Sequence, residues 1–256
     1  MSASDLDVGR VGMGPPVLLV HGSVVGAERT WHHQLALAEH WSLCIPNRPG
    51  FAASPPLARG DFELEAPLFA ELLGDGAHLV GHSYGAVIAL YAAALRPSAV
   101  RSLTISEPGC LRVAAGMELV DAQIANGERL YELADTLEPL EFLQAFRGGV
   151  GSTHATLAEL SSELLRGARL LMNERPPWHA DPPLAALAGE TFPKLVISGG
   201  HSSVFDAVCD LVASRIGARR VVVSGRGHTI PATGMPYNEL LHAFLTESES
   251  GLTVRP

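Results

Sequence analysis

Six short runs of nearly unbroken apolar character constrain the fold of this 256-residue chain most strongly. They lie at residues 17–20, 41–45, 77–80, 100–105, 194–197 and 219–223 and are rich in valine, leucine and isoleucine. A strand buried on both faces needs apolar side chains at successive positions, and strands of parallel sheets are buried in this way. Helical patterns lie between or after the runs, at 30–40, 64–73, 86–95, 204–216 and 237–246. This alternation predicts an α/β fold with a mostly parallel, doubly wound sheet.

The segment 110–192 interrupts the alternation, because it contains helical patterns and no good strand. Its apolar positions recur at helical spacing in two groups: Met117, Val120, Ile124, Tyr131 and Ala134, then Leu157, Leu160, Leu164, Ala168 and Leu171. Open α/β sheets bind ligands beyond the carboxyl ends of their strands. We therefore expect residues 1–109 and 193–256 to form the core and 110–192 to form a helical cap over it. Residues 247–256 are expected to be a frayed tail.

Composition and charge indicate which binding partners and which location are expected for the protein. The chain has 27 acidic and 18 basic residues and a net charge of −9, which argues against a nucleic-acid-binding surface. No run is long enough to span a membrane, and the first residues do not resemble a secretion signal. Three widely separated cysteines fit core positions in a reducing compartment. We expect a cytoplasmic protein whose partner is a small molecule.

Residues 81–85, which read Gly-His-Ser-Tyr-Gly, carry the strongest chemical signal. They follow a predicted strand and precede a predicted helix, and we call this turn the elbow. A serine on such a sharp turn needs small residues two positions away on each side, and Gly81 and Gly85 meet that need. The turn would expose the hydroxyl of Ser83 beside N–H groups at a helix N-terminus. The alternative is an ordinary glycine-rich turn.

In this context the chain resembles the α/β-hydrolase family from residue 17 to about residue 245. Residues 19–23 (Leu-Val-His-Gly-Ser) look like the family's His-Gly loop, and 225–228 (Gly-Arg-Gly-His) match its late histidine. The resemblance implies a nucleophile at Ser83, a general base at His228, and an oxyanion hole built from the N–H groups of Ser23 and Tyr84. Residues 46–51 (Pro-Asn-Arg-Pro-Gly-Phe) resemble a further family loop. There Asn47 replaces the usual Asp and Ala52 the usual Gly, at positions we interpret as structural.

The third member of the triad is harder to place. The family usually has an Asp after the penultimate strand, where this chain reads Gly-Gly-His-Ser-Ser at 199–203, with Ser202 at the Asp position. We favour Glu107, which follows the strand after the nucleophile, as in some haloalkane dehalogenases and zearalenone-type lactonases. Adjacent strand ends open into one crevice, so a carboxylate there can reach His228. Glu107 could instead be only a helix cap, Asp206 could be the acid, or no charged acid could be present.

A serine nucleophile favours acyl transfer to water, on a carboxylic ester or lactone, with no metal or organic cofactor. The same residues would suit a carbon–carbon bond hydrolase, a cofactor-free perhydrolase or a hydrolase-like binding protein. An apolar pocket is predicted from the aromatic and methionine residues of the cap and the loops, although such residues are often core. The candidates are Trp31, Phe51, Met117, Phe142, Phe146 and Trp178. No cluster of Arg or Lys accompanies the elbow in the sequence, which disfavours a highly anionic substrate.

Overall fold

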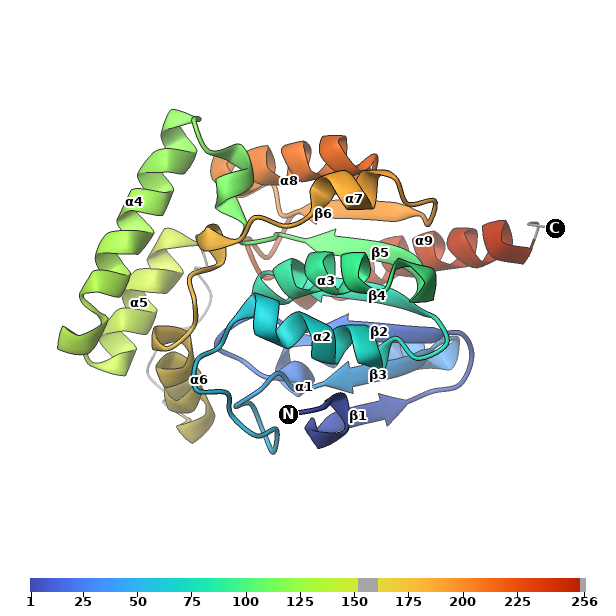
Figure 1. Cartoon of the computed structure of the whole chain (residues 1–256), viewed down its shortest axis with the longest axis horizontal. Helices are drawn as coiled ribbons and strands as arrows, with labels where there is room; N and C mark the ends of the chain where they lie inside the picture. Colours follow the sequence, from blue (N-terminus) through green and yellow to red (C-terminus); the bar gives the residue numbers. More distant parts are fainter. Residues whose placement is uncertain (152–160, 254–256) are drawn as a thin grey trace.

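A single seven-stranded sheet organises the described residues, 1–151 and 161–253 of this computed structural model (Figure 1). The strands are β1 Val8–Val11, β2 Pro16–Val20, β3 Ser42–Pro46, β4 Ala77–His82, β5 Val100–Ser106, β6 Lys194–Ser198 and β7 Arg219–Val222, in the order β1-β3-β2-β4-β5-β6-β7. Strand β1 is antiparallel to β3, and every other pair is parallel. The predicted fold class is confirmed.

All six apolar runs are strands, but the edge strand β1 was not predicted from the sequence. It pairs with β3 alone, and three of its four residues are exposed. Because an edge strand of this kind does not need apolar side chains on both faces, Val8–Val11 carries no continuous apolar run.

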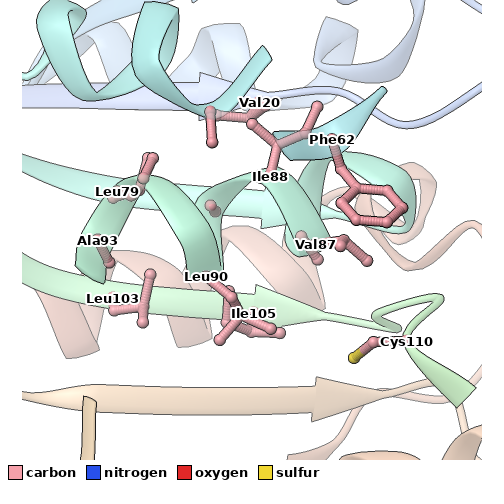
Figure 2. Close-up of a cluster of buried hydrophobic side chains, with 14 of the residues drawn as sticks. Val20, Phe62, Leu79, Val87, Ile88, Leu90, Ala93, Leu103, Ile105 and Cys110 are labelled. Carbon is pink, nitrogen blue, oxygen red and sulfur yellow. The ribbon is translucent and has the colours of Figure 1, made fainter. Parts of the chain in front are cut away.

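Two layers of helices bury the two faces of the sheet. In the described residues the helices are α1 Ala27–Thr30, α2 Phe62–Leu72, α3 Tyr84–Leu95, α4 Glu118–Glu132, α5 Pro139–Gly149, α6 Ser162–Met172, α7 Leu184–Ala188, α8 Ser203–Ile216 and α9 Met235–Thr253. Alternate side chains of β2 show the division: Leu18 and Val20 belong to the buried cluster that includes α2, α3 and α8, and Val17 and Leu19 belong to the cluster that includes α9. Figure 2 shows strand residues Leu79, Leu103 and Ile105 packed beneath α3.

Two helical predictions need correction. The pattern at 30–40 is not one α-helix: α1 ends at Thr30, and His32–Glu39 is a 3₁₀ helix. The predicted tail at 247–256 is helical up to Thr253, and residues 254–256 lie outside the described part. Buried Ser248 and an ion pair between Glu249 and Arg101 at 3.0 Å attach this last stretch to the domain.

Helices α4, α5 and α6 lie at the end of the sheet toward which the parallel strands point (Figure 1). They have a small core of their own, formed by Phe142 and Leu143 of α5 against Ala168 and Leu171 of α6. Of the apolar positions predicted for this region, Leu157 and Leu160 fall outside the described residues. The insertion between β5 and β6 is thus helical in its described parts, next to the strand ends where a site is expected.

The three cysteines, Cys44, Cys110 and Cys209, are buried and unpaired. Their position agrees with the predicted role in core packing. Within the described part of the chain, no helix combines the length and the apolar character needed to cross a membrane.

Candidate active site

Ser83 lies on a tight turn between β4 and α3, with a backbone φ of 56° that non-glycine residues rarely adopt. A Cβ on Gly81 would lie 2.5 Å from the carbonyl oxygen of Gly85, and one on Gly85 would lie 2.3 Å from the carbonyl oxygens of Val20 and His21. Glycine at both positions is therefore a steric requirement of this turn. The strained turn places the hydroxyl of Ser83 above the sheet.

His228 follows β7 and contacts both Ser83 and Glu107. Its Nε2 lies 2.8 Å from Oγ of Ser83, and its Nδ1 lies 3.0 Å from Oε2 of Glu107. Burial lowers the pKa of His228, which makes the imidazole neutral at rest. The ionised carboxylate can only accept, so Nδ1 carries the proton and Nε2 accepts from the hydroxyl. His82 donates through Nε2 to the backbone oxygen of His228 at 2.8 Å and holds its loop in place.

Glu107 directly follows β5 in a left-handed conformation with φ of 49°, and its side chain is fully buried. It does not cap a helix. The N–H of Gly199 donates to its Oε1 at 2.6 Å. Burial raises the pKa of Glu107 to about 7, against the opposing effects of the Gly199 hydrogen bond and His201. Asp206, the other candidate acid, instead accepts hydrogen bonds from Ser198 and from Arg220 on its own side of the sheet.

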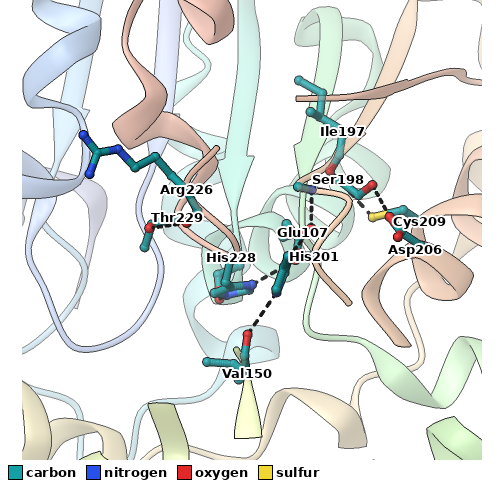
Figure 3. Close-up of polar contacts among 12 residues, drawn as sticks. Glu107, Val150, Ile197, Ser198, His201, Asp206, Cys209, Arg226, His228 and Thr229 are labelled. Carbon is teal, nitrogen blue, oxygen red and sulfur yellow. Dashed lines mark hydrogen bonds and ion pairs between the residues drawn. The ribbon is translucent and has the colours of Figure 1, made fainter. Parts of the chain in front are cut away.

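His201 is a neighbour of Glu107 that the sequence analysis did not single out. Its Nε2 lies 3.1 Å from the carbonyl oxygen of Val150, at the end of α5, and donates a hydrogen bond to it (Figure 3). Its Nδ1 is buried, lacks a hydrogen bond within the described residues, and lies 3.7 Å from Oε1 of Glu107. Glu107 is thus flanked by two imidazoles. In the described residues, Glu107, His201 and His228 form the one group whose ligand atoms, all within 4.8 Å of one another, could hold a metal ion.

The loop after β2 passes directly over the elbow. A Cβ on Gly22 would lie 3.0 Å from Cβ of Ser83. The N–H of Ser23 donates no hydrogen bond within the described residues, and that of Tyr84 lies in the first turn of α3, where no helical acceptor exists. The hydroxyl of Ser23 donates to Glu174 at 2.5 Å, and a Cβ on Gly167 of α6 would lie 1.7 Å from the carbonyl oxygen of Val24. The loop is therefore held from the side of the inserted helices.

Beneath this loop lies a buried ion network centred on Arg48. Its guanidinium contacts Glu65 at 2.8 Å and Glu174 at 2.8 Å, with all three side chains at most 2% exposed. It also donates to the carbonyl oxygen of Gly22 at 3.0 Å. The backbone N–H of Arg48 donates to Nε2 of His21, whose pKa burial lowers to about 3. The network fixes the shape of the loop that faces Ser83.

The two departures in the loop 46–52 have structural explanations. The side-chain oxygen of Asn47 accepts from the N–H of Ala27 at 2.9 Å, and its amide donates to Asp7 at 3.1 Å. Ala52 has a φ of 45°, in the region that favours glycine. Neither residue contributes to the elbow, and their interpretation as structural positions agrees with these contacts.

A cavity of about 280 Å³ opens above Ser83. Its described walls are Gly22, Ser23, Val24, Val25, Arg29, Thr30, His82, Ser83, Phe146, Arg147, Val150, Leu164, Arg226, His228, Thr229, Pro231 and Ala232. The apolar members of this set line most of the surface. A cavity of this size suits a small ligand or one end of a longer one.

Of the six predicted pocket residues, only Phe146 lines the cavity. The other five need correction. Trp31 and Phe142 are fully buried in separate clusters, and Phe51 packs against the ring of His21. Met117 is exposed at the start of α4, and the indole N–H of Trp178 donates to Glu128. Aromatic residues at helical spacing were here mostly core. Loop residues such as Val24 and Val25, which give no periodic signal in the sequence, form part of the wall instead.

Comparison with known proteins places this geometry in a family. The family model described as alpha/beta hydrolase fold matches residues 15–137. A pimeloyl-[acyl-carrier protein] methyl ester esterase from Aeromonas hydrophila subsp. hydrophila is 30% identical over 189 residues, which cover 71% of this chain and 68% of that protein. The chain belongs to the α/β-hydrolase fold family. The family predicted from the sequence is therefore confirmed.

Two further proteins are similar to this α/β-hydrolase, one in sequence and one in fold. An enzyme of the same name from Methylococcus capsulatus is 32% identical over 179 residues, or 65% of this chain, and the match spans only 63% of that relative's length. The structure of a hydrolase from Oleispira antarctica has a TM-score of 0.77 at 19% identity, over 96% of this chain and 98% of that one. The second likeness concerns the fold alone.

Proposed function

We propose that this α/β-hydrolase is a serine hydrolase that cleaves a carboxylic ester, lactones included, through Ser83, His228 and Glu107. The observation that carries the proposal is the continuous hydrogen-bonded series from the Ser83 hydroxyl through His228 to Glu107 at the floor of a largely apolar cavity. The two relatives, both methyl ester esterases, support the same class of reaction.

In the proposed reaction, Oγ of Ser83 attacks the ester carbonyl while neutral His228 takes the hydroxyl proton at Nε2. Glu107 then faces an imidazolium whose Nδ1–H it accepts, so the charge formed on His228 is balanced by a buried carboxylate. His228 next gives the proton at Nε2 to the leaving alkoxide. In the second half, His228 activates water, which attacks the acyl-enzyme and releases the acid and free Ser83.

The developing oxyanion would be held by the N–H groups of Ser23 and Tyr84. The N–H of Tyr84 lies at the start of α3, where the helix dipole also favours negative charge. The Ser23 hydrogen bond to Glu174 and the Arg48 bond to the Gly22 carbonyl would keep the loop in place while charge develops. Preorganised donors of this kind need no rearrangement during the reaction.

The apolar walls of the cavity favour an acyl or alkyl group of modest size, and we propose that residues 110–192 act as a cap over it. Three buried free thiols suit a reducing compartment, so the cytoplasm is the proposed location.

Fluorophosphonate labelling followed by peptide mapping tests the proposal, together with hydrolysis of p-nitrophenyl butyrate. We expect the label on Ser83 only, and no ester turnover in the Ser83→Ala protein. Turnover by Ser83→Ala at the wild-type rate would remove Ser83 from the mechanism. Labelling without turnover of any ester would favour a binding protein or a different bond as the target.

A further inference from the structure

Among the described residues, the charged side chains that line the cavity have one sign only. Arg29, Arg147 and Arg226 line it, and no Asp or Glu belongs to its described walls. The two histidines of the wall have pKa values lowered by burial and are neutral. In a chain of net charge −9, a random set of three charged residues would more often include an acid. The mouth of the cavity is therefore a local reversal of the protein's charge.

The three arginines come from separate segments of the chain. Arg29 belongs to α1, Arg147 to α5, and Arg226 to the loop before His228. Only the fold brings them together, which is why the sequence analysis found no basic cluster near the elbow. Because three arginines line the cavity, the lack of a basic cluster in the sequence does not exclude an anionic substrate.

Two of these arginines are placed where they can contact a ligand. Arg29 and Arg226 are exposed, and neither forms an ion pair with a carboxylate within the described residues. Several arginines elsewhere do so, Arg101 and Arg220 among them. Figure 3 shows the guanidinium of Arg226 directed away from the Glu107–His228 contact. The side chain of Arg226 therefore points away from the proposed reacting atoms.

We propose that the arginines form a subsite for a negatively charged group on the substrate, at the end remote from the bond that is cleaved. The proposal rests on the proposed ester hydrolysis. A guanidinium presents a planar fork of donors that matches a carboxylate. Most of the remaining described wall surface is apolar, with Val24, Phe146 and Leu164 among its residues. The matching substrate class is a hemiester: an ester at one end, a short apolar chain, and a carboxylate at the other end.

The test compares two esters of equal chain length, p-nitrophenyl hydrogen glutarate, which is anionic, and p-nitrophenyl pentanoate, which is neutral. We expect the intact protein to prefer the anionic ester in kcat/KM, mainly through a lower KM, and to lose the preference in 0.5 M NaCl. In an Arg29→Gln/Arg226→Gln protein the anionic-to-neutral ratio should fall by about tenfold or more, as expected for lost charge-assisted hydrogen bonds. Arg215→Gln, which removes an exposed arginine of α8, is the matched control and should leave the ratio unchanged.

A ratio that is the same in the intact and the double-variant proteins, with both esters hydrolysed, would overturn the anionic subsite and leave ester hydrolysis standing. Binding to the Ser83→Ala protein, measured by calorimetry, gives a readout that does not need turnover. Tighter binding of the glutarate hemiester than of the pentanoate ester, lost on adding the two arginine substitutions, supports the subsite even if hydrolysis fails. Equal binding of the two esters refutes it.

Discussion

The buried guanidinium of Arg48 offers the sharpest test of how the site is built. It faces two carboxylates, Glu65 and Glu174, and all three side chains are at most 2% exposed. In Arg48→Met the length of the side chain is roughly kept, but two buried carboxylates lose their cation. Removing one partner from a buried ion network costs about 3–5 kcal/mol. At about 2–4 °C per kcal/mol for a chain of this size, Tm should fall by roughly 6–20 °C.

Thermal unfolding followed by circular dichroism measures the effect. Arg175→Met is the matched control, because Arg175 also faces two acids, at 3.4 and 3.2 Å, but is 27% exposed. Such partly solvated pairs contribute about 0–1 kcal/mol.

The deficit in Tm of the Arg48→Met protein, relative to the wild type, should also depend on pH. Burial already raises the pKa of Glu174 in the folded protein, and loss of Arg48 raises it further. A raised carboxyl pKa disfavours folding as pH rises through it, so the deficit should be larger at pH 8 than at pH 5.

Two results would refute this reasoning. If Arg48→Met lowered Tm no more than Arg175→Met, the buried carboxylates would not need their cation. If the deficit grew on acidification, the sign of the carboxylate effect would be wrong. We also expect Arg48→Met to reduce kcat, because its bond to the Gly22 carbonyl supports the loop over Ser83.

Three further predictions can be tested separately. Glu107→Gln should lower kcat by roughly 10⁴ with the protein still folded, and Asp206→Asn should have little effect; an opposite ranking in steady-state assays would make Asp206 the acid. Burial raises the pKa of Glu107 to about 7, and its carboxylate must be ionised, so kcat/KM should fall as pH drops through about 7. Because His201 lowers the pKa of Glu107, His201→Ala should move this acidic limb of the pH profile to higher pH. An acidic limb that does not move would exclude His201 as a positioning residue. Gly85→Ala should cost about 3 kcal/mol or more, since its Cβ would meet carbonyl oxygens at 2.3 Å, whereas Gly148→Ala, with open space, should stay within about 1 kcal/mol of wild type; equal Tm values would contradict the steric argument.

The sequence predicts the parts of this fold whose constraints are local. Strands such as Val100–Ser106 are buried on both faces and therefore apolar along their length. The elbow needs Gly81 and Gly85 for steric reasons that hold wherever such a turn occurs. Glu107 could be selected because neighbouring parallel strands end at the same edge. Its contact with His228 agrees with that reasoning, and its catalytic role stays a prediction.

The remaining features depend on contacts between distant segments. His201 matters only because Glu107 lies beside it, and nothing in residues 199–203 indicates that neighbour. Arg29 and Arg226 are 197 positions apart in the sequence and meet at one cavity. Trp31 shows the opposite error, since an aromatic residue near the active-site loop packs into the core. Contacts between segments that are far apart in the sequence produce no periodic pattern, so a single sequence does not predict them.

The contacts of the loop over Ser83 with the inserted helices have a consequence for chimeric enzymes. Exchanging the region between β5 and β6 for that of a relative would appear to change substrate choice alone. Here, however, the exchanged piece carries Glu174, which binds the Ser23 hydroxyl, and Gly167, where any side chain would collide with Val24. A graft without that carboxylate and that glycine would change the turnover of every substrate. In this protein, substrate specificity and turnover rate therefore cannot be exchanged separately, because Glu174 and Gly167 of the insertion affect both.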